Sequence, residues 1–178
     1  MSDLVNELYI RSQEGHILSG NLKNHFFVHR IDSSLDIAQY LEKVHLNGQP
    51  LPGHVMDWNN KNETGDVLIT DFINLSTVLV FLEQILVDDL EHENSSSQTE
   101  MKTLENKLFS ILCQTETILQ TLGLKVPSHV TRDVMDNALR DVKNTADRRK
   151  RDYTMAKDAV HLMKANEDNH IKMKAAYN

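Results

Sequence analysis

Hydrophobic residues recur at intervals of three and four through two consecutive stretches, 67–91 and 98–122. This spacing places a hydrophobic stripe along one side of an α-helix, so each stretch is predicted to be helical. The stripe of the first stretch is wide, which is typical of a central helix. The second stretch opens with Ser97-Gln-Thr-Glu100, a capping-box sequence, and ends before Gly123, which favours a left-handed cap. Only a short polar break separates them, so we expect an antiparallel helical hairpin.

Two further helices are predicted on either side of this hairpin. Residues 17–46 carry a long, imperfect hydrophobic stripe, whereas Gly15 and Gly20 weaken any helix that begins earlier, which leaves residues 1–16 ambiguous. Residues 132–166 keep helical spacing with a thin face of small side chains. A polar tail, residues 167–178, is expected to fray from this last helix.

The connections between the four predicted helices are long, short and medium in length. About twenty residues separate the first two helices, enough extended chain to run the length of a bundle, whereas the hairpin link is too short to do so. The sequence therefore predicts an all-α, single-domain four-helix bundle over residues 1–178. Its expected connectivity is up-up-down-down, with long crossovers between the first and second and between the third and fourth helices.

Composition excludes some classes of function. The formal net charge of −7 and the pI near 5.7 argue against a nucleic-acid-binding protein, which needs a basic face. Cys113 is the only cysteine, so an intramolecular disulfide is excluded, and its position in a helical stretch predicts a small buried side chain. We find no run of about 18 apolar residues and expect no membrane insertion. The first residues lack the features of a signal peptide, so the chain is either not classically secreted or a mature form with an added Met.

Catalytic motifs are missing from the sequence. Glu42-Lys-Val-His45 matches the Glu-x-x-His pattern of di-metal bundles, and Asp158-Ala-Val-His161 is an imperfect second copy, but the other two helices offer no glutamate squarely within their stripes. There is no phosphate-binding glycine loop, no Gly-x-Ser-x-Gly turn and no plausible Cys–His pair. We therefore expect a protein that is not an enzyme and that uses neither a metal nor another cofactor.

Three local features suggest interactions. Arg148-Arg149-Lys150-Arg151 is a dense basic cluster, which fits a partner-binding patch, a nuclear import signal, a processing site or a solvated face balanced by nearby acids. Trp58 lies in a polar loop, where it either pins the loop to the core or anchors a partner. Glycosylation sequons begin at Asn62, Asn74 and Asn94, of which Asn62 and Asn94 fall in predicted loops.

Three segments resemble the long-chain four-helix cytokines of the interleukin-6-type family, in particular the ciliary neurotrophic factor and cardiotrophin-like branch. These segments are Tyr40-Leu-Glu-Lys-Val-His-Leu-Asn-Gly-Gln-Pro50, Asp57-Trp58, and Thr117-Ile-Leu-Gln-Thr-Leu-Gly-Leu-Lys-Val-Pro127. The resemblance implies a secreted, extracellular growth factor that binds class I cytokine receptor chains as a monomer, clusters them and triggers kinase signalling inside the cell. The Phe-x-x-Lys motif that some members carry where the last helix begins is missing here, which puts the corresponding receptor in doubt.

The resemblance also implies three receptor-binding surfaces. The first would include Lys157 and His161. The second would draw on the first and third helices, and the third would include Trp58. The second surface would include Lys23, Arg30, Glu116 and Gln120. The basic cluster adds Arg148, Arg149 and Arg151 to the expected receptor-binding residues. The alternative hypothesis is an intracellular, cytoplasmic all-α adaptor that binds a protein partner through its last helix.

Overall fold

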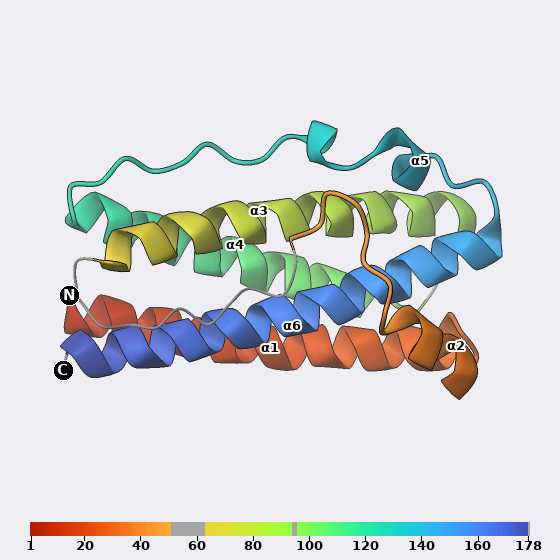
Figure 1. Ribbon diagram of the computed structural model, residues 1–178, viewed down its shortest axis with the longest axis horizontal. Helices are drawn as coiled ribbons and strands as arrows, with labels where there is room; N and C mark the ends of the chain where they lie inside the picture. Colours follow the sequence, from red (N-terminus) through yellow and green to blue (C-terminus); the bar gives the residue numbers. More distant parts are fainter. Residues whose placement is uncertain (51–62, 94–95, 178) are drawn as a thin grey trace.

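The computed structural model describes residues 1–50, 63–93 and 96–177, and within them the protein is all-α, without a β-strand. The predicted fold class is therefore confirmed at this level. The helices are α1 (Ser2–His29), α2 (Leu35–Leu41), α3 (Thr64–Asp88), α4 (Gln98–Thr121), α5 (Asn137–Arg140) and α6 (Thr145–Tyr177), with a π-helical turn η2 (Asp89–Glu93) and a 3-10 turn η3 (Arg132–Val134). Four long helices, α1, α3, α4 and α6, lie side by side, and both termini lie at the same end (Figure 1).

Contacts between residues distant in sequence give the relative directions of these helices. In each helix pair, residues early in one helix meet residues late in the other, so the paired helices are antiparallel. The contacts are Ser12 with His170 and Arg30 with Asp152 for α1 and α6, Thr64 with Tyr177 and Asp88 with Arg151 for α3 and α6, and Leu4 with Gln114 and Glu14 with Lys107 for α1 and α4. Both α1 and α3 therefore run opposite to α6, and in the same direction as each other (Figure 1).

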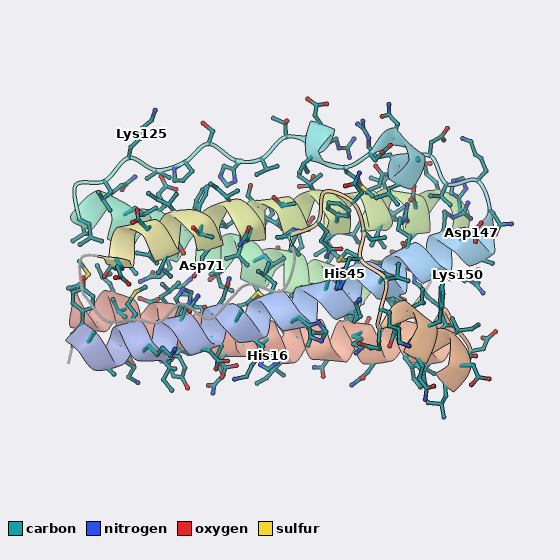
Figure 2. All side chains as sticks on the ribbon, viewed as in Figure 1. His16, His45, Asp71, Lys125, Asp147 and Lys150 are labelled. Atoms are coloured by element: carbon teal, nitrogen blue, oxygen red, sulfur yellow. The ribbon has the colours of Figure 1, made fainter. Side chains whose placement is uncertain are left out.

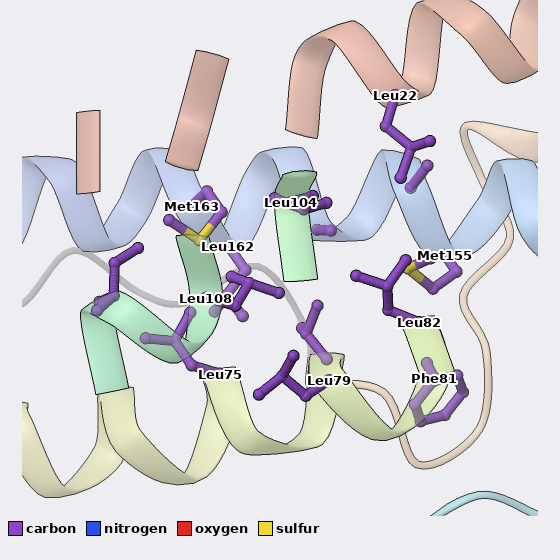
Figure 3. Packing of buried hydrophobic residues seen from close by; sticks show 14 of the residues in the cluster. Leu22, Leu75, Leu79, Phe81, Leu82, Leu104, Leu108, Met155, Leu162 and Met163 are labelled. Atoms are coloured by element: carbon purple, nitrogen blue, oxygen red, sulfur yellow. The ribbon is translucent and has the colours of Figure 1, made fainter. Parts of the chain in front are cut away.

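The hydrophobic core fills the space between the four long helices. Leucines of α3 and α4 meet methionines and a leucine of α6 there (Figure 3); the labelled examples are Leu75, Leu79, Leu82, Leu104, Leu108, Met155, Leu162 and Met163. Each such side chain contributes roughly 1.5–3 kcal/mol by leaving water. On α1, Gly15 allows a close approach, because an added Cβ would lie 2.6 Å from the Met163 Cε atom and 3.0 Å from the Ile111 Cδ1 atom.

The central hairpin follows the sequence prediction closely. The observed helices, Thr64–Asp88 and Gln98–Thr121, differ from the predicted 67–91 and 98–122 by at most three residues. Gly123 has a φ of 70°, and the Leu124 N–H donates to the Leu119 carbonyl, which confirms the left-handed cap. The predicted capping box is wrong, since the Ser97 side chain makes no capping hydrogen bond to α4.

The first helix begins and ends earlier than predicted. It spans residues 2–29 instead of 17–46, because Gly15 lies where α1 approaches its neighbours and the loss of helix propensity is offset by packing. The helix stops before a turn in which Asp32 and Ser33 adopt left-handed φ values of 50° and 55°. The short helix α2 follows this turn.

The last helix is shifted toward the C-terminus. It was predicted over 132–166 with a frayed tail, whereas α6 spans Thr145–Tyr177. The predicted tail is helical because His170 and Met173 are buried against the bundle. Residues 122–144 instead form a long connection, with η3 and α5 within it, that runs along the outside of α3 (Figure 1). Ser76 of α3 anchors this connection by accepting a 2.8 Å hydrogen bond from the Val130 N–H.

Candidate functional site

The middle of α6 is buried and charged. All residues from 151 to 159 are buried, including Arg151, Asp152, Lys157 and Asp158. Buried charges must be paired to persist, so each of these side chains is expected to have a partner on another helix or loop. The partners show that this part of α6 holds the bundle together.

One group of partners forms a charged cluster at the end of the bundle. Arg30, which follows the last residue of α1, contacts Asp152 of α6 and donates to Asp89 across 2.7 Å. Arg151 bridges Asp152 and Asp88, with a 2.7 Å separation from Asp88. Burial raises the pKa of Asp152, and the charges of Arg151 and Arg30 offset only part of this rise. The cluster joins α1, α3, η2 and α6, so Arg30 and Arg151 are interior side chains and not an exposed receptor contact.

Lys157 occupies a second buried position. Its ammonium donates to the carbonyls of Leu41 and Val44 at 3.1 and 2.5 Å and lies 2.9 Å from the Asp158 carboxylate. These two carbonyls lie at and just after the end of α2, so Lys157 ties this part of the chain to α6. Lys157 is fully buried, and the structure places it beneath the surface to which the sequence assigned it.

The Glu-x-x-His motif and its imperfect second copy lie close together. His45 Nδ1 is 2.9 Å from Asp158 Oδ1 (Figure 2 shows His45 against α6), so the motif containing Glu42 meets the motif containing His161. Asp158 is nevertheless already engaged by Lys157 and His45. Across the described ranges, no three His, Cys, Asp or Glu side chains are placed to hold a metal ion.

Near Lys157, four side chains form a group that we call the Lys23 surface: Lys23, Glu42 and His161 reach the surface, whereas Tyr153 is buried. Lys23 donates to Glu42 across 2.8 Å and lies 5.8 Å from the centre of the Tyr153 ring. Burial on its own would raise the pKa of Glu42, but the hydrogen bond and charge of Lys23, together with Lys157 and His161, lower it overall. Burial and the neighbouring Glu42 raise the pKa of Tyr153 to about 12.

Glu116 and Gln120 lie far from the Lys23 surface. They are on the outer side of α4 and hydrogen bond to each other across 3.0 Å. Gln114, two residues before Glu116, donates to the Leu4 carbonyl, which places this end of α4 beside the start of α1. Lys23 is 19 residues after Leu4, or roughly 28 Å along the helix at 1.5 Å per residue. The residues predicted to form the second surface therefore lie in two separate places, with Lys23 at one and Glu116 and Gln120 at the other.

The remaining predicted site residues differ in how far they are buried. Arg148 is buried and donates to the carbonyls of Val142 and Lys143 at 3.2 and 3.1 Å. Arg149 is half-buried and lines a cavity of about 340 Å³ at the start of α6. The basic cluster is thus largely structural. Trp58, Asn62 and Asn94 lie outside the described residues.

Several surface residues were missed or misplaced by the sequence reasoning. Cys113 is exposed, so the prediction of a buried side chain is wrong. Ile10, Ile17 and Val28 are 45, 58 and 49% exposed. Their separations of seven and eleven residues place them within about 20° of one another around α1. We call this line of side chains the α1 stripe; its spacing outside the main hydrophobic pattern was the signal that could have revealed it.

A polar bridge inside the bundle was also missed. Ser12 Oγ is 2.7 Å from His170 Nδ1, and His170 Nε2 is 3.0 Å from Asp71 Oδ2 (Asp71 is labelled on α3 in Figure 2). The residue types are those of a Ser–His–Asp triad, but all three side chains are buried, so a substrate has no access to the serine. The bridge links α1, α6 and α3 as a structural element.

The segment Thr64–His92 is long and apolar enough to cross a membrane by length and composition, but 67% of its most apolar window is buried inside the protein, as in core helices of soluble proteins. No protein-family model matches the chain, and neither a curated protein nor a solved structure shows significant similarity to it.

Proposed function

We propose that the protein is a secreted, non-enzymatic signalling ligand of the long-chain helical cytokine type. In this proposal it binds the extracellular domains of class I cytokine receptors as a monomer. By holding two receptor chains together, it triggers the kinases associated with their cytoplasmic parts.

The direction of the four long helices carries the proposal. The helices α1 and α3 run one way, and α6 runs opposite to both, as α4 does to α1. A short link joins α3 to α4, whereas residues 42–63 and 122–144 are long links. We propose that this is an up-up-down-down four-helix bundle with two crossovers, the connectivity of growth hormones and cytokines.

Receptor clustering requires two surfaces that do not overlap, and the exposed residues supply candidates. The α1 stripe presents apolar side chains to solvent along more than four helical turns, which supports its use as a protein interface. The Lys23 surface presents the polar side chains of Lys23, Glu42 and His161 to solvent where α1 and α6 meet, over the buried Tyr153. We propose these as two receptor contacts, with Glu116 and Gln120 extending the interface at the opposite end of the bundle.

The experiment is biolayer interferometry of the purified protein against immobilised extracellular domains of class I cytokine receptors. Ile17→Asp tests the α1 stripe, and Ile171→Asp is its matched control because Ile171 is 47% exposed on α6. We expect saturable binding to at least one receptor chain, about 10-fold or more weakened by Ile17→Asp and unchanged by the control. Absence of binding to every receptor chain would refute the proposal.

The intracellular adaptor remains a second candidate, but no observation favours it. The adaptor hypothesis assigns partner binding to the basic cluster of the last helix. Arg148 and Arg151 of that cluster are buried and bonded to other parts of the protein, so they are not exposed to a partner.

A further inference from the structure

A cavity of about 340 Å³ lies where the start of α6 meets the turn that follows α1. This volume is in the range of small-molecule sites in proteins. Ile31, Ile37 and Ala146 give the cavity apolar walls, and charged side chains complete its lining. Lys150, one of these charged residues, is labelled at this end of α6 in Figure 2. The lining includes no residue of the α1 stripe or the Lys23 surface.

The charged side chains of this lining are mostly cationic. They are Arg30, Arg149 and Lys150, against the single carboxylate of Asp32. Lys150 is half-exposed, and its ammonium lies 3.3 Å from the equally exposed carboxylate of Asp147. An exposed pair of this kind contributes little free energy, so Lys150 can turn from Asp147 to a bound anion at small cost. The cavity therefore favours a negatively charged ligand.

The start of α6 adds hydrogen-bond donors to these cations. The first N–H groups of a helix have no acceptor within the helix and carry partial positive charge, which favours anions. Helix α6 begins at Thr145, and both Thr145 and Ala146 line the cavity. The next N–H group, that of Asp147, donates to the Asn144 side chain across 3.1 Å. The two N–H groups before it are at the cavity.

The side chain of Arg30 gives an independent observation. Arg30 is only 5% exposed, and its two Nη atoms donate to Asp152 and Asp89. Its Nε atom is shielded from solvent and has no hydrogen-bond partner among the described residues. A buried N–H group without a partner costs free energy, and an anion seated in the cavity against Arg30 would remove that cost.

We propose that this cavity binds a small phosphate monoester. Its phosphate group accepts hydrogen bonds from the Arg30 Nε–H, the start of α6, Arg149 and Lys150. At neutral pH such a group carries a charge of about −1.5 to −2 and three acceptor oxygens, which suits several cationic donors at once. The organic part of the ligand packs on Ile31 and Ile37. The site goes beyond the proposed receptor binding and does not depend on it.

The test is a titration of the full chain, labelled with ¹⁵N, with phenyl phosphate in a buffer free of phosphate and sulfate. Proton–nitrogen NMR spectra should show saturable shifts of the Arg30 Nε–H signal and of the Thr145 and Ala146 amide signals. Inorganic phosphate should bind about 5-fold or more weakly, because it lacks the apolar part. Phenol, which lacks the charge, should give no saturable shift of these signals.

Lys150→Ala should weaken the binding of phenyl phosphate about 10-fold, because it removes a charged donor. Its fold should stay intact, which circular dichroism checks, since Lys150 is on the surface. Lys143→Ala is the matched control: it also removes an exposed ammonium close to the start of α6, but Lys143 does not line this cavity and pairs with Asp141. This control should bind phenyl phosphate as the wild type does.

The proposal is overturned if phenyl phosphate gives no saturable shift, or if the Arg30 Nε–H signal stays in place while other signals move. It is also overturned if Lys150→Ala binds phenyl phosphate as tightly as the wild type. Equal binding of inorganic phosphate and phenyl phosphate would refute the assignment of the apolar walls to an organic ligand.

Discussion

Replacement of Arg30 by alanine should be one of the most destabilising single changes in the protein. The Arg30 guanidinium bridges Asp89 and Asp152, and all three side chains are almost fully buried. Removing one partner of a buried ion pair typically costs about 3–5 kcal/mol, because the remaining charge is left uncompensated. For a chain of this size, the melting temperature should fall by roughly 6–20 °C.

The loss should also depend on pH. Burial already raises the pKa of Asp152, and Arg30 is one of the charges that counteract the rise. A raised pKa in the folded state means that folding favours the protonated carboxyl, so this group's contribution to stability falls as pH rises through that pKa. Without Arg30 the pKa should rise further, and the loss of stability should be greater at neutral than at acidic pH.

Urea unfolding followed by circular dichroism measures the loss. Arg132→Ala is the control, because Arg132 is exposed on the connection before α5, and it should change stability by no more than about 0.5 kcal/mol. If Arg30→Ala costs less than about 1 kcal/mol at neutral pH, the charged cluster does not hold the bundle end as described.

Four further substitutions test other parts of the structure. At a pH above the ordinary pKa of Glu42, Glu42→Gln should lower the free energy of unfolding by less than about 1 kcal/mol. This loss should vanish as the pH falls through the lowered pKa that Glu42 has in the folded protein. A loss of stability that persists in acid would contradict the pairing of Glu42 with Lys23. Gly20→Ala should stabilise the protein by about 0.5–1 kcal/mol, since nothing lies within 4 Å of the added Cβ. Gly15→Val should destabilise the protein by about 1–3 kcal/mol, because its side chain would meet Met163 and Ile111. Thermal melts that show equal effects of the two substitutions would refute the close approach at Gly15. Leu79→Asp places a charge in the core and should cost about 4 kcal/mol or more, so a variant that melts like the wild type would mean that the buried side of α3 is wrong.

The parts of the fold that follow local rules were predictable. In α3 and α4 the hydrophobic period, the polar break and Gly123 all agree, and the helix bounds come within three residues. Local signals suffice there because the buried side of each helix is made of large aliphatic side chains whose spacing is visible in the sequence.

The ends of the chain were predicted less well because their packing uses polar and small residues. Gly15 was expected to weaken a helix and left residues 1–16 ambiguous, although in the structure it provides space for Met163 within α1. The end of α6 was read as a polar tail, although His170 and Asn169 are buried there. A pattern of hydrophobic residues cannot reveal a buried side whose members are glycine, histidine and asparagine, since their partners lie on other helices.

Several candidate site residues were also misplaced because their partners are distant in sequence. Arg151 and Lys157 were assigned to the surface because charged residues are usually exposed, but their partners, such as Asp88, are far away in sequence. Lys23 and Glu116 were placed on one surface, although antiparallel packing of α1 and α4 puts a residue late in one helix opposite a residue early in the other. Lys23 is late in the observed α1 and Glu116 is late in α4, so the antiparallel directions place them at opposite ends of the helix pair.

The most direct test of the central claim is whether one molecule of the protein brings two receptor chains together. Two receptor extracellular domains that carry different fluorophores are mixed with the protein, and energy transfer between them is recorded as protein is added. We expect a signal that rises and then falls with excess protein, and that is lost when Ile17→Asp removes the contact of the α1 stripe while the Lys23 surface still binds one receptor chain. If the receptor chains never approach each other at any concentration of the protein, the protein does not cluster receptors.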